Sequence, residues 1–265
     1  MRHRAVVALL VIVAIAVVWY GGHWAIRIPA TDPLLAIAHR GAPAGSGTAE
    51  GTLAAFRAAI TAGADMLEFD VRRTRDGELV VLHDETVDRT TNGSGRVADL
   101  TFAEVRALDA GDGERIPTVA ELLDLALASG TPILPEVKDG PGNPGLTEDL
   151  ADLLRSRGAL GLAIVQAFEA ETLEKLRRVA PEARACWLTG IGVLDASDPP
   201  AGAAFICPMG EMVLLNPGLV RAAHARGLKV LAWWNVAESG PANAALVAYG
   251  VDGIMVDDLR TLPVR

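Results

Sequence analysis

Short apolar runs alternate with longer amphipathic stretches from about residue 34 onward. Eight of the runs have the length and aliphatic content of buried strands and predict strands at residues 35–39, 66–71, 132–138, 163–168, 184–188, 203–207, 229–234 and 253–256. The stretches between them, such as 52–63, 118–130, 170–181 and 217–227, have helical periodicity and end in glycine or proline. Alternating strands and helices indicate parallel strands, and eight of these close a (β/α)₈ TIM barrel.

One connection in this pattern is much longer than the others. After the second strand, the turn signal Asp76-Gly77 leads into another apolar run, Leu79 to Leu82, which predicts a hairpin. The rest of the segment up to Pro117, including TTNGSGRVADL, predicts a long loop inserted into the barrel. Long loops in compact domains are usually functional, and this one follows the carboxyl end of a strand, where barrel enzymes carry their chemistry.

The first 30 residues differ from the rest of the chain. Arg2 and Arg4 precede an apolar run from Ala5 to Tyr20, without a convincing small-residue cleavage site after it. This pattern predicts a signal anchor or transmembrane segment over residues 1–30, which would hold a catalytic domain, residues 31–265, at a membrane and outside the cytoplasm. Secretion after signal cleavage is the second interpretation, and a buried core helix is the third.

Composition narrows the class of protein. A chain of 265 residues with 51% hydrophobic and only 5% aromatic residues suits one α/β barrel. The net charge of −9 argues against a nucleic-acid partner, since phosphate backbones attract basic surfaces. Two cysteines, Cys186 and Cys207, are too few for a disulfide framework. They are predicted to be small buried hydrophobic residues, although export would permit one bridge. Oligomeric state stays open.

Ionisable residues gather at the ends of the first three barrel strands. The residues concerned are His39 and Arg40 after the first strand, Glu68 and Asp70 on one face of the second, His83 at the end of the hairpin, and Glu136 and Lys138 on one face of the third. A structural ion pair would account for Glu136 and Lys138, and a rim histidine for His39. Their joint position at one rim favours an active site.

Glu68 and Asp70 carry the strongest signal. Two buried carboxylates on one strand face repel each other unless a proton or a cation lies between them. A hard divalent cation with oxygen ligands removes this cost and recruits Glu136 as a third ligand. Two histidines beside such a cation suggest general acid and base catalysis near neutral pH. Cleavage of a phosphodiester fits all of these groups.

The order of these motifs resembles the glycerophosphodiester phosphodiesterase family from about Ala36 to Leu259. The matching segments are His39-Arg40-Gly41, Glu68-x-Asp70, Thr74-Arg75-Asp76-Gly77, His83-Asp84, DRTTNGSG, IPTVAELL, Glu136-Val137-Lys138 and GVDGIMVDDL. The resemblance implies a TIM barrel that hydrolyses glycerophosphodiesters to sn-glycerol 3-phosphate and an alcohol, as part of lipid and glycerol metabolism.

The same resemblance implies roles for single residues. It implies that His39 and His83 are the acid and base, that Glu68, Asp70 and Glu136 bind one divalent cation, Mg²⁺ or Ca²⁺, and that Arg40 and Lys138 contact the phosphate. Further substrate contacts are implied at Glu50, Phe168, Trp233 and Asn235. The chain departs from the family pattern around these last four positions. In the seventh barrel strand, either Trp233 or Trp234 faces inward, because adjacent strand residues point to opposite sides.

Two other functions remain open from the sequence. The same barrel would serve a lysophospholipase D or another phospholipase-type phosphodiesterase, and a membrane anchor would suit a lipid substrate. A non-catalytic exported binding protein is also compatible with the scaffold, because fold does not fix function. The retention of both histidines and all three carboxylates argues against this second alternative.

Overall fold

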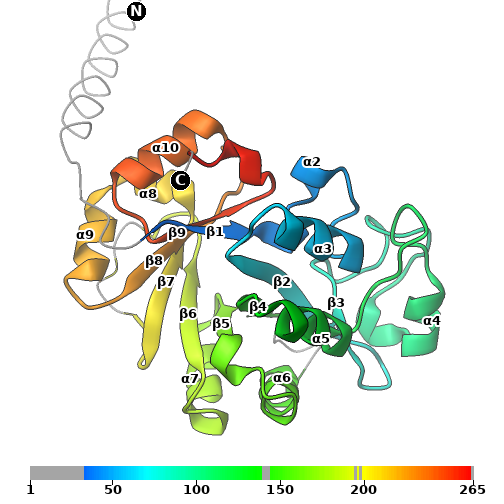
Figure 1. The fold of residues 1–265 in the computed structure, drawn as a ribbon. Helices are drawn as coiled ribbons and strands as arrows, with labels where there is room; N and C mark the ends of the chain where they lie inside the picture. The colour runs from blue at the N-terminus through cyan, green and yellow to red at the C-terminus, as the bar shows by residue number, and fades with distance from the viewer. Residues whose placement is uncertain (1–32, 139–143, 194–195, 197–198, 264–265) are drawn as a thin grey trace, which may run out of the picture.

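The computed structural model describes residues 33–138, 144–193, 196 and 199–263. Its centre is a closed barrel of eight parallel strands, with helices around the outside (Figure 1). The barrel strands are β1 (Leu35–Ala38), β2 (Met66–Arg73), β4 (Ile133–Val137), β5 (Ile164–Ala167), β6 (Arg184–Thr189), β7 (Ala203–Pro208), β8 (Lys229–Ala232) and β9 (Gly253–Val256). Pairing of β1 with both β2 and β9 closes the ring.

Each predicted strand is present, and its bounds differ from the expected ones by at most two residues at either end. The apolar runs are buried on both sides because strands of a parallel barrel contact helices outside and one another inside. The helices are α2 (Pro43–Ser46), α3 (Leu53–Thr61), α4 (Phe102–Ala107), α5 (Val119–Ser129), α6 (Leu146–Ser156), α7 (Ala170–Val179), α8 (Gly210–Leu215), α9 (Gly218–His224) and α10 (Gly240–Ala248). Single 3₁₀ turns are η1 (His39–Gly41), η2 (Val97–Asp99), η3 (Leu160–Leu162) and η4 (Leu259–Thr261).

The insertion after β2 contains the predicted hairpin and more. Strand β3 (Leu79–Val81) pairs antiparallel with β2 as the ninth strand of the sheet. The segment expected to be one long loop also forms η2 and α4, which lie to one side of the barrel (Figure 1). Thr101 and Glu104 cap α4 reciprocally, so a local helix signal was present in this segment. A small core of its own, which includes Val87 and Ile116, holds the insertion together.

The barrel interior is polar near the carboxyl ends of its strands and apolar further from those ends. Its apolar layer consists of buried side chains that each strand contributes: Ile37, Met66, Leu134, Ile164, Cys186, Leu188, Cys207, Leu231 and Met255. Because side chains alternate along a strand, the residue two positions further on also faces the interior, nearer the carboxyl end. By this parity, Ile37 precedes His39, Met66 precedes Glu68, and Leu134 precedes Glu136. The polar residues therefore occupy the mouth of the barrel.

The two cysteines correct the expectation of separate hydrophobic residues. Cys186 of β6 and Cys207 of β7 are fully buried and form a disulfide, with their Cα atoms 6.0 Å apart. The register places Leu188 opposite Cys207 and Phe205 opposite Cys186, so the cysteines are diagonal neighbours on the interior face. That proximity depends on strand register, which the cysteine count does not reveal.

This disulfide is expected to stabilise the fold. Its sequence separation is 21 residues, and crosslinks of about that length contribute roughly 3 kcal/mol to the free energy of unfolding. A reductant is expected to lower the Tm of the wild-type protein by several degrees. The Cys186→Ala/Cys207→Ala variant should already melt lower and show no response to reductant. A wild-type Tm that reductant leaves unchanged would contradict this expectation.

The predicted amino-terminal anchor, residues 1–30, lies outside the described residues. Within the part of the chain that the structure describes, no helix has both the length and the apolar content required to cross a bilayer.

Candidate active site

A cavity of about 370 Å³ opens at the carboxyl ends of the barrel strands. Its lining combines charged and aromatic side chains from seven of the eight strands and from the hairpin. These residues are His39, Arg40, Glu68, His83, Glu136, Lys138, Gln166, Phe168, Leu188, Trp233, Trp234, Asn235, Met255 and Asp257. The lining includes nearly all of the site residues predicted from the sequence. Asp70 and Glu50 instead line a small neighbouring pocket, which shares Arg40 and His83 with the cavity.

Three buried carboxylates form the floor of this site. Oxygen atoms of Glu68, Asp70 and Glu136 all lie within 4.8 Å of one another. The strand register explains this proximity, because Asp70 of β2 pairs directly with Glu136 of β4 and Glu68 lies two residues before Asp70 on the same face. The predicted ligand set is therefore assembled by two neighbouring strands, and it could hold a metal ion.

The three carboxylates differ in how readily they ionise, because nearby cations outweigh the effect of burial on the pKa of Asp70 but not on those of Glu68 and Glu136. Burial, together with repulsion by Asp70, raises the pKa of Glu68 to about 7 and the pKa of Glu136 to about 8. Burial opposes ionisation of Asp70 as well, but the Lys138 ammonium 3.1 Å from Oδ1 and the other nearby cations lower its pKa. The donor set of three oxygen ligands with excess negative charge fits a hard divalent cation.

A tight turn after β1 carries two of the site residues. His39, Arg40 and Gly41 form η1, in which Arg40 adopts φ 48° and Gly41 φ 88°. A β-carbon on Gly41 would approach the β-carbon of Ala55 to 2.7 Å, so α3 packs too closely for any other residue. The turn aims the Arg40 backbone N–H at Glu68, to which it donates a hydrogen bond of 3.0 Å. The strained, left-handed backbone of Arg40 therefore positions a hydrogen-bond donor for Glu68.

His39 is oriented by a carboxylate from the last barrel strand. Its Nδ1–H donates to Asp257 Oδ1 at 2.7 Å, and its Nε2 lies 4.0 Å from Glu68. Burial alone would lower the pKa of His39, but the Asp257 hydrogen bond and the Glu68 charge raise it above the usual value. Glu238 accepts hydrogen bonds from the backbone N–H groups of Asp257 and Asp258, which fixes the strand exit. His39 Nε2 is therefore the ring nitrogen available to a substrate.

His83 has an equivalent arrangement on the hairpin. Its Nδ1–H donates to Asp84 at 2.7 Å, and Arg89 donates two hydrogen bonds to that carboxylate. Arg72 of β2 donates to the His83 carbonyl oxygen, which fixes the backbone as well. Burial lowers the pKa of the His83 ring. Both predicted histidines thus have a carboxylate on Nδ1 and leave Nε2 free.

Glu50 belongs to the support of the site rather than to the main cavity. It accepts two hydrogen bonds from Arg89 at 2.7 and 2.8 Å and one from Arg40 at 3.3 Å. Arg89 therefore joins the His83–Asp84 pair to Arg40 through Glu50. Two guanidinium groups thus bind the carboxylate of Glu50, and the substrate contact expected for this residue stays a prediction.

Aromatic side chains form the opposite side of the cavity. The rings of Phe168 and Trp233 pack edge to face, with their centroids 5.8 Å apart. The register resolves the choice between adjacent tryptophans: Trp233 lies two residues after the interior Leu231, whereas Trp234 packs in the outer core and donates its indole N–H to Asn243 of α10. Asn235 lines the cavity as expected.

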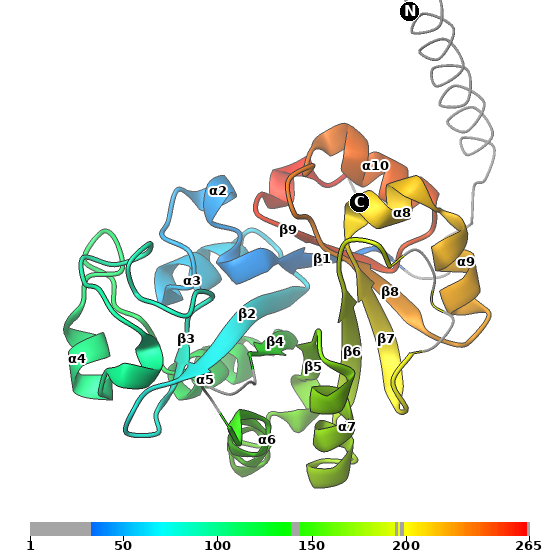
Figure 2. The same ribbon diagram turned by 180° about the vertical axis from the view of Figure 1, so that it is seen from behind.

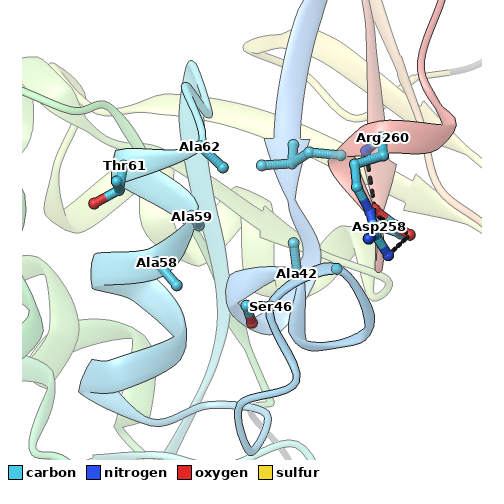
Figure 3. Close-up of a pocket in the computed structure, with 10 residues that line it drawn as sticks. Ala42, Ser46, Ala58, Ala59, Thr61, Ala62, Asp258 and Arg260 are labelled. Carbon is cyan, nitrogen blue, oxygen red and sulfur yellow. Dashed lines mark hydrogen bonds and ion pairs between the residues drawn. The ribbon is translucent and has the colours of Figure 1, made fainter.

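A second cavity, of about 360 Å³, lies between α3 and the segment after β9 (Figure 3). Its walls are mostly small side chains, including Ala58, Ala59 and Ala62. Its one lining carboxylate, Asp258, is paired with Arg260 at 2.7 Å. This cavity lacks the histidines and the carboxylate cluster of the first, so the barrel mouth is the candidate active site.

Comparison with known proteins identifies the family of this chain. The profile of the glycerophosphoryl diester phosphodiesterase family matches residues 39–261. The chain belongs to this family. A glycerophosphodiester phosphodiesterase of Caldanaerobacter subterraneus is 34% identical over 236 residues, which cover 86% of this chain and 96% of that protein.

Solved structures of the family have the same barrel. The glycerophosphodiester phosphodiesterase of Agrobacterium tumefaciens superposes with a TM-score of 0.74 at 28% identity, over 86% of this chain and 99% of that one. A phosphodiesterase of Oleispira antarctica in complex with the product sn-glycerol 3-phosphate has a TM-score of 0.72 at 26% identity, over 86% of this chain and 94% of that one.

The site also contains support residues that were not predicted from the sequence. Asp257 and Gln166 lie two positions after the interior residues Met255 and Ile164, so strand parity alone would have placed them in the mouth. Gln166 donates to Glu68 at 3.0 Å. Arg89 lies within the quoted DRTTNGSG segment, but its contacts with Asp84 and Glu50 become visible only in three dimensions.

Arg89 is expected to matter through the groups it holds. The Arg89→Met variant should lower kcat on the order of tenfold with little change in KM, because Asp84 and Glu50 lose their shared partner and His83 loses its fixed orientation. Arg96→Met is a matched control, since Arg96 is a half-exposed arginine of the same insertion that pairs with Glu85 away from the cavity. Steady-state kinetics of both variants test this. Equal activities would contradict a positioning role for Arg89.

Proposed function

We propose that this protein hydrolyses glycerophosphodiesters to sn-glycerol 3-phosphate and an alcohol. The observation that carries the proposal is the convergence of two carboxylate-linked histidines and three buried carboxylates on one cavity. The relative from Oleispira antarctica, whose structure contains sn-glycerol 3-phosphate, supports the choice of product.

Glu68, Asp70 and Glu136 would hold one divalent cation, Mg²⁺ or Ca²⁺. When bound, such an ion supplies Lewis acidity for the phosphoryl oxygens. It also balances carboxylate charge that Lys138 and Arg40 only partly compensate. Titration of the protein with Mg²⁺ and with Ca²⁺ would identify the ion.

His39 and His83 would move the protons of the reaction. In each ring the Nδ1–H is held by a carboxylate, which only accepts hydrogen bonds, so Nε2 is the atom that takes or gives a proton at the substrate. One histidine removes a proton from the attacking oxygen and the other donates one to the departing alcohol. Lys138 and Arg40 line the same cavity and lie 3.1 and 3.5 Å from Asp70, and they would orient the phosphate by charge.

The aromatic side of the cavity would receive the glycerol group. Phe168 and Trp233 present apolar surface opposite the charged residues, and Asn235 adds a polar group beside them. We propose further that residues 1–30 anchor the chain in a membrane with the barrel outside the cytoplasm, because Arg2 and Arg4 precede an apolar run from Ala5 to Tyr20. A cavity that receives glycerol and a barrel anchored at a membrane would both suit a role in lipid and glycerol metabolism.

A direct assay tests the proposed activity. The protein, supplied in turn with Mg²⁺, Ca²⁺ or excess chelator, is incubated with glycerophosphocholine, glycerophosphoethanolamine and glycerophosphoglycerol. Release of glycerol 3-phosphate is followed by coupled oxidation. We expect metal-stimulated release from at least one of these substrates. Absence of release from all three with either metal would exclude the proposed function.

A further inference from the structure

Different contacts orient the two histidines of the site. Asp84, the partner of His83, accepts two hydrogen bonds from Arg89, so another side chain fixes its carboxylate. Among the described residues, the carboxylate of Asp257 accepts a hydrogen bond only from His39 itself. The Asp257 side chain is 52% exposed, so packing does not hold it on the ring either. The backbone of Asp257 must therefore set the direction of its side chain.

One carboxylate holds that backbone on both sides. Glu238 Oε2 accepts a hydrogen bond from the Asp257 N–H at 2.9 Å, and Oε1 accepts one from the Asp258 N–H at 3.2 Å. These two N–H groups belong to the peptide planes that flank the Asp257 Cα atom. Bonds from one carboxylate to both planes fix the backbone dihedral angles between them, and hydrogen bonds to an ionised acceptor are the stronger kind. Glu238 therefore sets the direction in which the Asp257 side chain leaves the backbone.

Glu238 is part of a polar network that reaches α10. Thr261 Oγ1 donates to the Asp258 carbonyl oxygen at 2.6 Å and lies 3.2 Å from Glu238 Oε1. Asn243 of α10 is fully buried, donates to Thr261 Oγ1 at 2.9 Å and accepts from the Trp234 indole N–H at 2.7 Å. A buried network whose members bond one another is rigid. The segment after β9 is therefore held in place from α10 as well as by Glu238.

Glu238 lies close to the cavity without lining it. It belongs to the connection from β8 to α10, which begins with the lining residues Trp233, Trp234 and Asn235. Strands β8 and β9 are neighbours in the barrel, so this connection runs beside the segment that carries Asp257 (Figure 2). Any effect of Glu238 on turnover must therefore reach the substrate through other residues.

We propose that Glu238 is a positioning residue, which keeps the Asp257 carboxylate on Nδ1 of His39 and so keeps Nε2 directed into the cavity. The inference rests on the proposed function, in which Nε2 takes or gives a proton. Which ring nitrogen of a neutral histidine carries the proton depends on the hydrogen bond that the other nitrogen makes. If Asp257 turns towards solvent, the proton is free to occupy Nε2 and the ring is free to rotate. Glu238 thus has the role for His39 that Arg89 has for the other histidine, but it acts on the backbone of the partner instead of its carboxylate.

A double-mutant cycle in the full-length protein, with metal supplied, tests this role. Glu238→Ala is expected to lower kcat for the best glycerophosphodiester substrate roughly tenfold and to leave KM within about twofold. In the Asp257→Ala background, the same substitution should change kcat by less than about twofold, because the residue through which Glu238 acts is already absent. Equal effects of Glu238→Ala in both backgrounds would overturn the proposal. Glu238→Gln, which retains one acceptor oxygen, replaces Glu238→Ala in the cycle if that variant does not fold.

Glu211→Ala is the matched control. Glu211 Oε1 also accepts hydrogen bonds from two backbone N–H groups of the β8–α10 connection, those of Val236 at 2.9 Å and Ala237 at 3.0 Å, but these bonds do not reach the segment after β9. The control removes a second carboxylate that orders the same connection, and kcat should stay within about twofold of the wild-type value. A loss of kcat equal to that of Glu238→Ala would show that the order of the connection, and not the orientation of His39, limits turnover, and the proposal would be wrong.

Nitrogen NMR of the histidine-labelled protein tests the orientation of His39 independently of turnover. At alkaline pH, where the ring is neutral, the His39 signals of the wild type and of Glu211→Ala should show the proton on Nδ1. In Glu238→Ala, a substantial fraction of the rings should carry it on Nε2, and the His39→Gln variant assigns the signals. An unchanged Nδ1–H form in Glu238→Ala would refute the proposal. Absence of glycerophosphodiester turnover in the wild type would instead remove the proposed function, and the NMR comparison would still decide whether Glu238 orients His39.

Discussion

Replacing His39 or His83 with glutamine is expected to lower kcat by about 10²–10⁴-fold, with a much smaller effect on KM. Each imidazole presents Nε2 to the cavity because its Nδ1–H is bound to Asp257 or Asp84. Glutamine preserves the size and polarity of the side chain but does not exchange a proton at neutral pH. The measurement is steady-state release of glycerol 3-phosphate under saturating metal.

His224→Gln provides the matched control for both substitutions. His224 also pairs with a carboxylate, Asp252, at 2.8 Å, but it lies in α9 away from the strand exits that form the cavity. Its replacement should leave kcat within about twofold. The double variant of His39 and His83 should be little worse than either single variant, because groups that act in one proton-transfer sequence are not additive. Near-normal turnover of either single variant would show that the assigned proton transfers are wrong.

The barrel itself was predictable because its signals are local. Strands buried on both faces read as continuous apolar runs, and the intervening helices carry their own end signals, as at Gly130 after α5. The insertion was harder to predict. Helix α4 has six residues and is stabilised by packing on Val87, Val97 and Ile116, so its apolar periodicity is too short to stand out.

The placement of the site depended on strand parity. Glu68, Asp70, Glu136 and Lys138 were correctly grouped at the barrel mouth because alternation puts residues two apart on one face. The same rule applied to Met255 and Ile164 would have added Asp257 and Gln166.

Other features depend on contacts that no local pattern encodes. Arg89 reaches Glu50 across 39 positions of sequence. The Cys186–Cys207 bridge requires the relative register of β6 and β7, and the choice of Trp233 over Trp234 requires the register of β8. In each case, chain segments that are distant in sequence must already be aligned, and only the closed barrel supplies that alignment.

Substitution of the carboxylate cluster is expected to remove both metal binding and activity. Asp70→Asn and Glu68→Gln each delete one anionic ligand from a set whose oxygens lie within 4.8 Å. The loss of Lewis-acid stabilisation should lower kcat on the order of 10³-fold, and chelation of the wild-type protein should have a similar effect. Activity is measured by glycerol 3-phosphate release, and metal binding by the change in Tm.

Stability measurements separate a ligand role from a structural one. A cation at about 100 times its Kd should stabilise the wild-type protein by about 2.7 kcal/mol, and this increment should vanish in both variants. In the metal-free state, the Glu68→Gln variant should melt at the same temperature as the wild type or higher, because it relieves repulsion with Asp70.

Replacing a carboxylate that only stabilises the fold should change the metal-free Tm and the metal response in the opposite way. Asp252→Asn, which disrupts the contacts of Asp252 with His224 and Lys229, is expected to lower the metal-free Tm and to retain the metal response. A carboxylate of the cluster that lowers the metal-free Tm and still allows the metal-induced increase would be a structural group, like Asp252. The combination of a preserved or higher metal-free Tm with a lost metal response is expected only of a ligand, because repulsion among Glu68, Asp70 and Glu136 is tolerated for the cation that they bind.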